Sequence, residues 1–256
     1  MDDDAQSVLT SMEDGILTIR LNRPADSNAV NESLAKGVSA ALDLLDGEPG
    51  LRVGVITGNG PGFCSGMDLK AFLRGDNPTT ERGFAGIVRK PANKPLIAAI
   101  EGFALAGGLE VALSCDLIVA ARGARMGVPE VKRGLVAAAG GLMRLPRRIP
   151  YHAAMYLAIT GKAITAERAY ELGLVNELCD AGQAMACAMA LARVIVRNAP
   201  LAVQASKEIV QQALDLNEAA GWELQDRLGF PPLYTDDAKE GARAFVEKRD
   251  PVWQGR

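Results

Sequence analysis

Two glutamates twenty residues apart, Glu110 and Glu130, are the residues of this chain best placed to do chemistry. Each stands among glycine and apolar residues, where a carboxylate is rarely buried unless it is paired or hydrogen-bonded. Burial and repulsion between two acids both raise the pKa of a carboxyl group toward neutral pH. The pair therefore predicts proton transfer in a dry pocket.

Other polar residues of the chain, and Glu130 taken alone, have simpler interpretations. Glu130 on its own is more simply interpreted as a surface residue, because Lys132 and Arg133 follow it and most charge clusters are solvated. The single histidine, His152, has no nucleophile motif such as G-x-S-x-G beside it, so a structural or surface position is expected. One histidine cannot form a multi-histidine metal site, and no metal is expected. Acid–base chemistry therefore falls to the carboxylates.

A glycine-rich turn leads into the first of the two acids. The segment from Ile100 to Glu110 runs from a strand through Gly107 and Gly108 into a helix. Backbone N–H groups at a helix start have no intrahelical partner and stabilise an anion. A tight strand-to-helix connection is the simpler interpretation, but the acid three residues after Gly107 favours an oxyanion site with a proton carrier beside it.

A second glycine-rich loop, from Thr57 to Leu69, also follows a strand and precedes a short helix. Pro61 interrupts its glycines, and no acid ends a second strand at the distance that a dinucleotide-binding fingerprint requires. We therefore interpret the Met67 amide, after Ser65 and Gly66, as a second N–H donor into the same pocket.

Length and composition bound the class of protein. A chain of 256 residues, 48% hydrophobic and 23% charged, suits one large soluble domain, or a domain with a small appendage. The net charge of −3 argues against nucleic acid as the main partner, because phosphate binding needs a basic surplus. Four cysteines without a CxxC motif are expected to be free thiols. The acidic start, Met1 to Asp4, lacks the apolar segment of a secretory signal, and no uncharged apolar stretch is long enough to span a membrane. We therefore expect a cytoplasmic protein.

Alternating strands and helices predict an α/β core with mainly parallel strands, followed by a helical region after about residue 140. The stretch from Gly75 to Arg82 is typical of a mobile loop near the ligand entrance. Hydrophobic periodicity predicts strands at 16–21, 53–57, 96–100, 117–121 and 174–177, and helices at 31–45, 107–115, 153–159, 166–172, 183–196, 201–214 and 237–247.

Five motifs, in order and with suitable spacing over almost the whole chain, resemble those of the enoyl-CoA hydratase/isomerase family, the crotonases. They are Asn22-Arg23-Pro24 with Asn28-Ala29, Phe63-Cys64-Ser65-Gly66-Met67-Asp68-Leu69-Lys70, Ala106-Gly107-Gly108-Leu109-Glu110, Pro129-Glu130 and Phe245-Val246-Glu247-Lys248-Arg249. The resemblance implies an α/β fold with a crotonase-like spiral core of ββα units (residues 1–195) and a helical C-terminal trimerisation region that completes the coenzyme A site (residues 196–256). It also implies a homotrimer or a dimer of trimers.

The same resemblance implies an acyl-CoA thioester as the substrate, with neither metal nor other cofactor. Its carbonyl oxygen would be held by the N–H groups of Met67 and Gly107. Phe245 and Lys248 would approach the coenzyme A, often from a neighbouring subunit. The residues implied to border the coenzyme A and acyl groups are Ala25, Asp26, Ser27, Met67, Asp68, Leu69, Lys70, Phe245 and Lys248.

Family members that hydrate carry two glutamates, so the resemblance implies syn addition of water to a trans-2-enoyl-CoA, as in fatty-acid or other side-chain β-oxidation. Glu110 would act as the base on the water, and Glu130 would supply the proton to C2. Alternatives are an enoyl-CoA isomerase, a carnitinyl-CoA dehydratase-like reaction, or an inactive scaffold. Four residues depart from common family patterns and bear on the acyl substrate: Ala25, Met67, Ala106 and Ala137.

Overall fold

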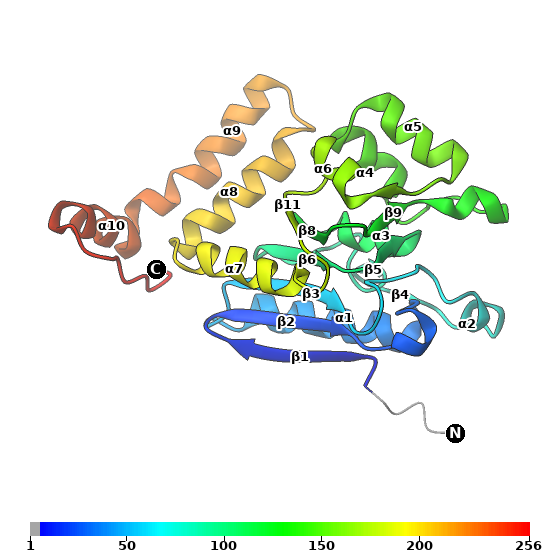
Figure 1. The fold of residues 1–256 in the computed structure, drawn as a ribbon. Coiled ribbons are helices and arrows are strands. Elements are labelled where there is room, and N and C mark those ends of the chain that lie inside the picture. Colours follow the sequence, from blue (N-terminus) through cyan, green and yellow to red (C-terminus); the bar gives the residue numbers. More distant parts are fainter. Residues whose placement is uncertain (1–5) are drawn as a thin grey trace.

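A six-stranded sheet in the order β1-β2-β3-β6-β8-β11 forms the centre of the chain (Figure 1). The computed structural model describes residues 6–256, so the acidic start lies outside the described residues. All neighbouring pairs except β1–β2 are parallel, which confirms the α/β class. The strands are β1 Val8–Glu13, β2 Ile16–Leu21, β3 Val53–Gly58, β6 Leu96–Ile100, β8 Leu117–Ala121 and β11 Glu177–Cys179.

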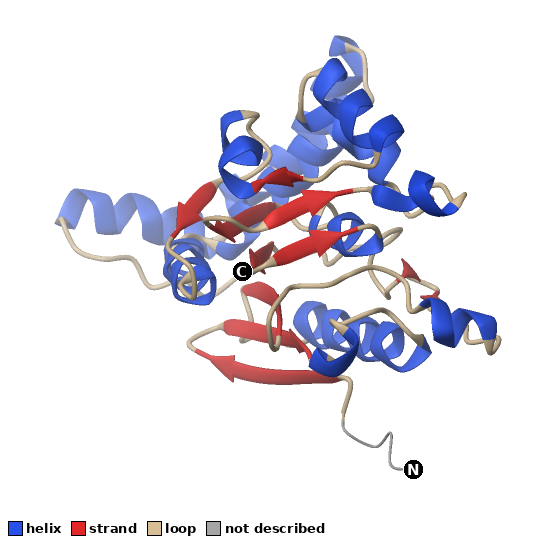
Figure 2. Ribbon diagram, turned by 45° about the vertical axis from the view of Figure 1, so that its right-hand side comes forward, coloured by secondary structure: helices blue, strands red, loops and turns tan. Residues whose placement is uncertain are grey.

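Helices cover both faces of this sheet (Figure 2), so its central strands β3, β6 and β8 are almost wholly buried. On one face, α7 (Ala184–Val196) packs alanines against alternate strand residues such as Val53 and Ile97. On the other face, α1 (Glu32–Gly47) buries its apolar stripe. The Asn31 side chain accepts a hydrogen bond from the Leu34 N–H at 2.9 Å, which confirms the expected N-cap.

A smaller sheet, in the order β10-β9-β7, positions the two glutamates. Strand β7 (Phe103–Leu105) leads into α3 (Gly107–Ala112), which carries Glu110. Strand β9 (Arg125–Gly127), which also pairs with β10 (Ile164–Thr165), leads into the 3-10 helix η2 (Pro129–Arg133), which carries Glu130. Because β7 and β9 are parallel neighbours, their carboxyl ends meet at one edge and bring the two acids together.

Helices dominate after residue 140, as expected, and α8 to α10 form an arm that extends away from the sheet (Figure 1). Large apolar side chains lie exposed on this arm: Val210, Leu214, Trp222, Leu233, Tyr234, Phe245 and Val246. Such a surface fits the predicted oligomerisation region, which stays a prediction, as does the limit at residue 195. The elements are α4 Gly141–Arg148, α5 Tyr151–Thr160, α6 Ala166–Glu171, α8 Pro200–Ala213, α9 Glu218–Gly229, η3 Pro231–Tyr234 and α10 Asp236–Glu247.

Most expected elements lie within a few residues of their predicted places, and the exceptions have physical causes. The strand expected at 174–177 starts only at Glu177, because the Leu174 and Val175 amides close the end of α6 by donating to the Ala169 carbonyl. Strand β1 and helix α9 were not predicted, since polar residues obscure the hydrophobic period of each.

In residues 6–256 no single helix is long and apolar enough to span a membrane, although α7 and α8 meet those criteria when joined across their 110° bend.

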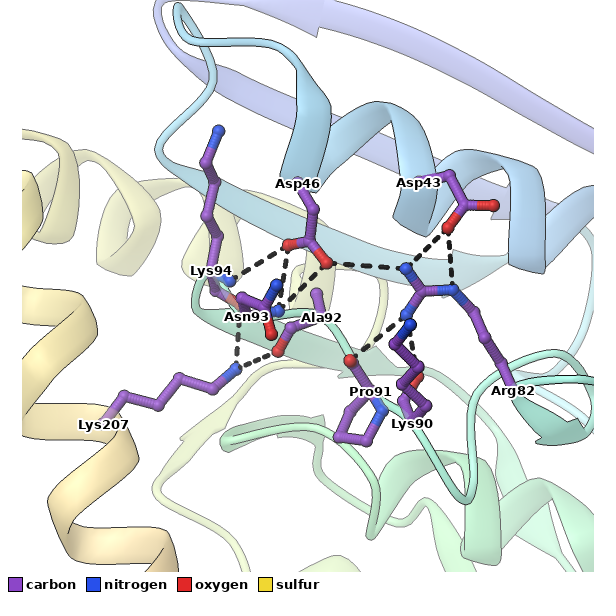
Figure 3. A network of polar contacts seen from close by, with 9 residues as sticks. All are labelled: Asp43, Asp46, Arg82, Lys90, Pro91, Ala92, Asn93, Lys94 and Lys207. Atoms are coloured by element: carbon purple, nitrogen blue, oxygen red, sulfur yellow. Dashed lines mark hydrogen bonds and ion pairs between the residues drawn. The ribbon is translucent and has the colours of Figure 1, made fainter.

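A polar network at the edge of α1 anchors the loop before β6 (Figure 3). The Arg82 guanidinium, 6% exposed, pairs with Asp43 and Asp46 and donates to the Lys90 and Pro91 carbonyl oxygens. The next residues are held as well: Asp46 accepts the N–H groups of Asn93 and Lys94, and Lys207 on α8 donates to the carbonyl oxygens of Ala92 and Lys94.

The same network restrains the segment expected to be a mobile loop. Its residues Thr79–Thr80 form β4, which pairs with β5 (Gly83–Phe84), and Arg82 between them is buried. The second half of the segment is therefore part of a hairpin held by a buried, paired cation and not an irregular loop, and its mobility stays a prediction. Helix α2 (Leu69–Leu73) precedes this hairpin.

Replacing Arg82 with methionine should lower the free energy of unfolding by about 3 kcal/mol, because it leaves the Lys90 and Pro91 carbonyl groups without this donor and the half-buried Asp46 carboxylate without its cation. Urea unfolding measures the change. The matched control is Lys36→Met, whose exposed ion pair with Glu32 contributes less than about 1 kcal/mol. Equal losses in the two variants would contradict the anchoring role of Arg82.

Candidate active site

Glu110 is a buried carboxylate with a defined partner. Its side chain lies in the first turn of α3 and is 3% exposed. One carboxylate oxygen, Oε1, accepts a hydrogen bond of 2.9 Å from the Gly141 N–H at the start of α4. Burial raises the pKa of Glu110, while hydrogen bonds from Gly141 and Ala139 and the positive charge of Arg144 act in the opposite direction. The net direction is upward.

Glu130 differs from Glu110 in having no such partner. Its Oε2 atom is buried and forms no hydrogen bond with any described residue. Burial, aided by the negative charge of Glu110, raises the pKa of Glu130 to about 7. The surface interpretation is wrong, because within residues 6–256 no ion pair joins Glu130 to Lys132 or Arg133. A carboxyl group of this kind can release or take up a proton near neutral pH.

An apolar cavity of about 400 Å³ extends from Glu130 between η2, α4 and α5. Glu130 is the only charged residue among those that line it, and Ala137, one of the departures from the family pattern, is among them. Met67 is not. The lining residues are Val128, Glu130, Val131, Val136, Ala137, Leu142, Leu145, Pro146, Tyr151, Ala154, Met155, Ala158 and Ile159.

The two predicted oxyanion donors lie where two backbone segments touch. A Cβ atom on Gly66 would lie 3.0 Å from the Gly107 nitrogen and 2.7 Å from the Ala106 Cβ, so only glycine permits this approach. Neither the Met67 N–H nor the Gly107 N–H donates to another described residue. The structure therefore brings both amides to one place with their hydrogen-bonding capacity unused.

Ala106, which precedes the Gly107 donor, has an unusual backbone conformation. Its φ of 52° and ψ of −130° lie in a region that alanine rarely adopts. Its N–H donates to the Gly127 carbonyl at 2.9 Å, and its own carbonyl accepts from Leu109 and Glu110. These bonds on both sides hold the turn that starts α3.

Phe84 is a site residue that sequence reasoning missed. A Cβ atom on Gly107 would lie 2.6 Å from the Phe84 Cε1 atom, so the ring packs directly against the predicted oxyanion donor. Phe84 belongs to β5, two residues after the anchored Arg82. No motif marks Phe84, and only the hairpin pairing of β4 with β5 places it here.

Asp68, predicted to border the substrate, is occupied by structural contacts. Its Oδ1 atom caps α2 by accepting from the N–H groups of Lys70 and Ala71, and its Oδ2 atom pairs with Arg23 at 3.0 Å. Burial raises the pKa of Asp68, but these hydrogen bonds and the Arg23 charge outweigh it and lower the pKa. Arg23 also pairs with Asp26, so the segments that carry Asp26 and Asp68 lie side by side.

Asn28 is a second residue whose role sequence reasoning did not find. It is fully buried, and its side chain joins two segments by accepting from the Arg23 N–H and donating to the carbonyl oxygens of Asn59 and Gly62 in the loop after β3. Its φ of 53°, next to Ser27 at 56°, turns the chain sharply after η1 (Pro24–Asp26). The hint in the sequence is the asparagine itself, which favours such a conformation.

The remaining predicted coenzyme A residues fall into two groups. Ala25, Asp26, Leu69 and Lys70 are exposed and Ser27 is half-buried, and these residues lie on the neighbouring segments η1 and α2. Phe245, 86% exposed, and Lys248 lie on or after α10, at the opposite side of the chain from α2 (Figure 1). One chain does not bring the second group to the site, and their approach from a neighbouring subunit stays a prediction.

Comparison with known proteins gives the same family from sequence and from structure. Residues 11–256 match the model of the enoyl-CoA hydratase/isomerase family. The enoyl-CoA hydratase EchA19 of Mycobacterium tuberculosis is 40% identical over 250 residues, which cover 94% of this chain and 93% of the relative. The carnitinyl-CoA dehydratase of Proteus mirabilis is 38% identical over 261 residues, which cover 98% of this chain and 100% of the relative.

Solved structures agree with these relatives. An enoyl-CoA hydratase from Mycobacterium tuberculosis H37Rv is 52% identical with a TM-score of 0.96, covering 98% of this chain and 100% of that chain. A carnitinyl-CoA hydratase from Mycobacterium avium is 41% identical with a TM-score of 0.78, covering 98% and 99%. These likenesses confirm the predicted crotonase-like fold. The chain belongs to the enoyl-CoA hydratase/isomerase family.

Proposed function

We propose that this protein is an enoyl-CoA hydratase, which adds water syn across the 2,3 double bond of a trans-2-enoyl-CoA to give a 3-hydroxyacyl-CoA. Membership of the family supports a reaction on an acyl-CoA thioester. The observation that carries the finer proposal is the pair of buried acids with unequal partners: Glu110 accepts the Gly141 N–H, whereas Glu130 has a buried oxygen without a partner.

The unequal partners suit the two proton transfers of hydration. Glu110, supported by a hydrogen bond and a nearby cation, is the base that takes a proton from water. Glu130, with a pKa raised to about 7, is the acid that protonates C2. The Met67 and Gly107 amides would hold the thioester oxygen, where negative charge develops, and each such donor contributes on the order of 10²–10³ in rate.

The cavity next to Glu130 favours an uncharged acyl group. A quaternary ammonium group, as in a carnitinyl thioester, is normally held by aromatic rings or by a carboxylate. Tyr151 is the only aromatic residue among the lining residues, and Glu130 is needed for proton transfer. Carnitinyl-CoA dehydration is the second candidate function, because relatives carry that name, but the apolar lining favours the hydratase.

We further propose that the protein acts in the cytoplasm as a homotrimer or a dimer of trimers. The exposed apolar surface of α8 to α10 supports assembly. Assembly would also bring Phe245 and Lys248 to the coenzyme A of a neighbouring subunit, since they lie far from α2 in their own chain (Figure 1).

Glu110→Gln and Glu130→Gln should each lower the rate of hydration by about 10²–10⁴-fold, because each substitution removes one proton carrier. The affinity for the thioester should persist in both variants. The loss of enoyl-thioester absorbance of trans-2-enoyl-CoA substrates measures the rate. The control is Glu171→Gln, an exposed residue paired with Arg168. Wild-type protein that dehydrates carnitinyl-CoA or isomerises 3-enoyl-CoA, yet hydrates no 2-enoyl-CoA, would overturn the hydratase proposal.

Glu130→Gln should also stabilise the protein at alkaline pH. The pKa of Glu130 lies at about 7, above the ordinary 4.5, so the folded state binds this proton more tightly than the unfolded state, and stability is lost as pH rises through 7. Glutamine mimics the protonated form. We expect a gain of about 1–2 kcal/mol at pH 8 and none at pH 4, measured by urea unfolding. A gain that does not vary with pH would contradict this prediction.

Filling the cavity should shorten the preferred chain. Ala158 lines the cavity from α5 and is half-buried, so phenylalanine there would occupy space without opening the core. In Ala158→Phe, kcat/KM for trans-2-decenoyl-CoA should fall about tenfold, with little change for trans-2-butenoyl-CoA. Ala158→Ser, which keeps the volume nearly constant, is the control. Equal losses for both chain lengths would show that the acyl chain lies elsewhere.

A further inference from the structure

Arg144 on α4 is a half-buried cation without a counter-ion. Its Nη1 atom donates to the Ser114 hydroxyl at 3.1 Å and to the Ala139 carbonyl at 3.5 Å, and its Nη2 atom donates to the Val88 carbonyl at 2.6 Å. All three acceptors are neutral. Within residues 6–256, no carboxylate forms an ion pair with Arg144, although buried charges are normally paired.

Two successive glycines bring this guanidinium to the same turn as Glu110. A Cβ atom on Gly140 would lie 2.7 Å from the Arg144 Nη1 atom, and a Cβ atom on Gly141 would lie 3.1 Å from the Glu110 Oε1 atom. The Gly141 N–H donates to that same oxygen. The turn before α4 is therefore in contact with the cation on one side and the carboxylate on the other.

Ser114 provides a second link between the cation and the carboxylate. It lies one helical turn after Glu110, is buried, and donates its hydroxyl hydrogen to the Glu110 backbone carbonyl at 2.8 Å. Its oxygen accepts from Arg144. Arg144 thus holds both backbone segments that define where the Glu110 side chain lies.

The charged groups that act on Glu110 come from two elements. Arg144 on α4 carries the opposite charge and lowers the pKa of Glu110, and Glu130 on η2 carries the like charge and is itself affected by Glu110. Arg148, one turn further along α4, acts on Arg144 and not on Glu110. Among residues 6–256, no cation acts on Glu130 in the same way, so the positive charge of Arg144 favours ionisation of Glu110 alone.

We propose that Arg144 is a positioning residue that divides the roles of the two acids: it fixes the Ala139–Gly141 turn and Ser114 around Glu110, and its unpaired positive charge favours the ionised form of Glu110 over that of Glu130. This inference rests on the proposed function only for the identity of the reaction. Arg144 would act on Glu110 in the same way whichever acyl-CoA reaction the two acids perform.

The test compares Arg144→Gln, Arg144→Lys and the control Arg147→Gln, whose exposed side chain pairs with Asp215. We expect kcat of Arg144→Gln at pH 7 to fall about tenfold or more, with KM within about threefold of wild type. The acidic limb of the kcat–pH profile, which reports ionisation of the base, should move about one unit upward because a cation has been removed. Arg144→Lys should keep the limb in place, and Arg147→Gln should match wild type.

A purely structural Arg144 would lower kcat of Arg144→Gln without moving the acidic limb, and that result overturns the proposal. So does a limb displaced equally in Arg144→Lys, which keeps the charge. If Arg144→Gln does not fold, Arg144→Met replaces it, because methionine keeps the apolar stem of the side chain and removes the charge; an unmoved limb there also overturns the proposal.

A readout without turnover separates this inference from the proposed function. In protein labelled with ¹³C at glutamate carboxyl groups, the resonance missing from Glu110→Gln identifies Glu110, and its titration gives the pKa directly. An upward shift in Arg144→Gln supports the inference even if the wild type hydrates no enoyl thioester. An unchanged titration overturns it even if hydration is confirmed.

Discussion

The close approach of two backbone segments at Gly66 and Gly107 is the steric constraint on which the rest of the site depends. A Cβ atom on Gly108 would lie 2.2 Å from the Cys64 carbonyl, so the contact continues along α3. Backbone can touch backbone here because these positions lack side chains. The contact places the amides of Met67 and Gly107, forty residues apart, in one location and leaves the walls of the site to other elements, namely Phe84 and the α4–α5 cavity.

Burying two carboxyl groups in one region disfavours the ionised form of both, and the fold stabilises the ionised form of one more than that of the other. Burial disfavours the ionised form of both acids, and the charge of Glu110 further disfavours ionisation of Glu130. The Ala139–Gly141 turn supplies a donor to Glu110, and α4 supplies the nearby cation, whereas Glu130 faces an apolar wall. Two chemically identical residues thereby acquire different surroundings, as acid–base chemistry in two steps requires.

The sequence alone identifies residues whose type and immediate neighbours suggest a role. It does not identify residues whose role depends on contacts made only in the folded chain. Acids beside glycines, and short apolar runs typical of buried strands, can be recognised in a single sequence. Glu110, Glu130 and most strands of the central sheet were therefore predicted. Phe84 and Arg144 were not, because their importance comes from the β4–β5 hairpin and from a turn thirty residues away from Glu110. Asp68 looked like a ligand residue because it stands in a motif, yet its oxygens are used in a helix cap and an ion pair.

The conformation of Ala106 has a consequence for handedness. A φ of 52° with a ψ of −130° is close to the mirror image of the extended polyproline conformation. An L-residue is strained in this state, whereas a D-residue would occupy it as one of its ordinary minima. At this one residue the backbone dihedral angles therefore have the signs that a D-residue prefers. As a result, the Gly107 amide points in a direction that ordinary dihedral angles between β7 and α3 would not give it.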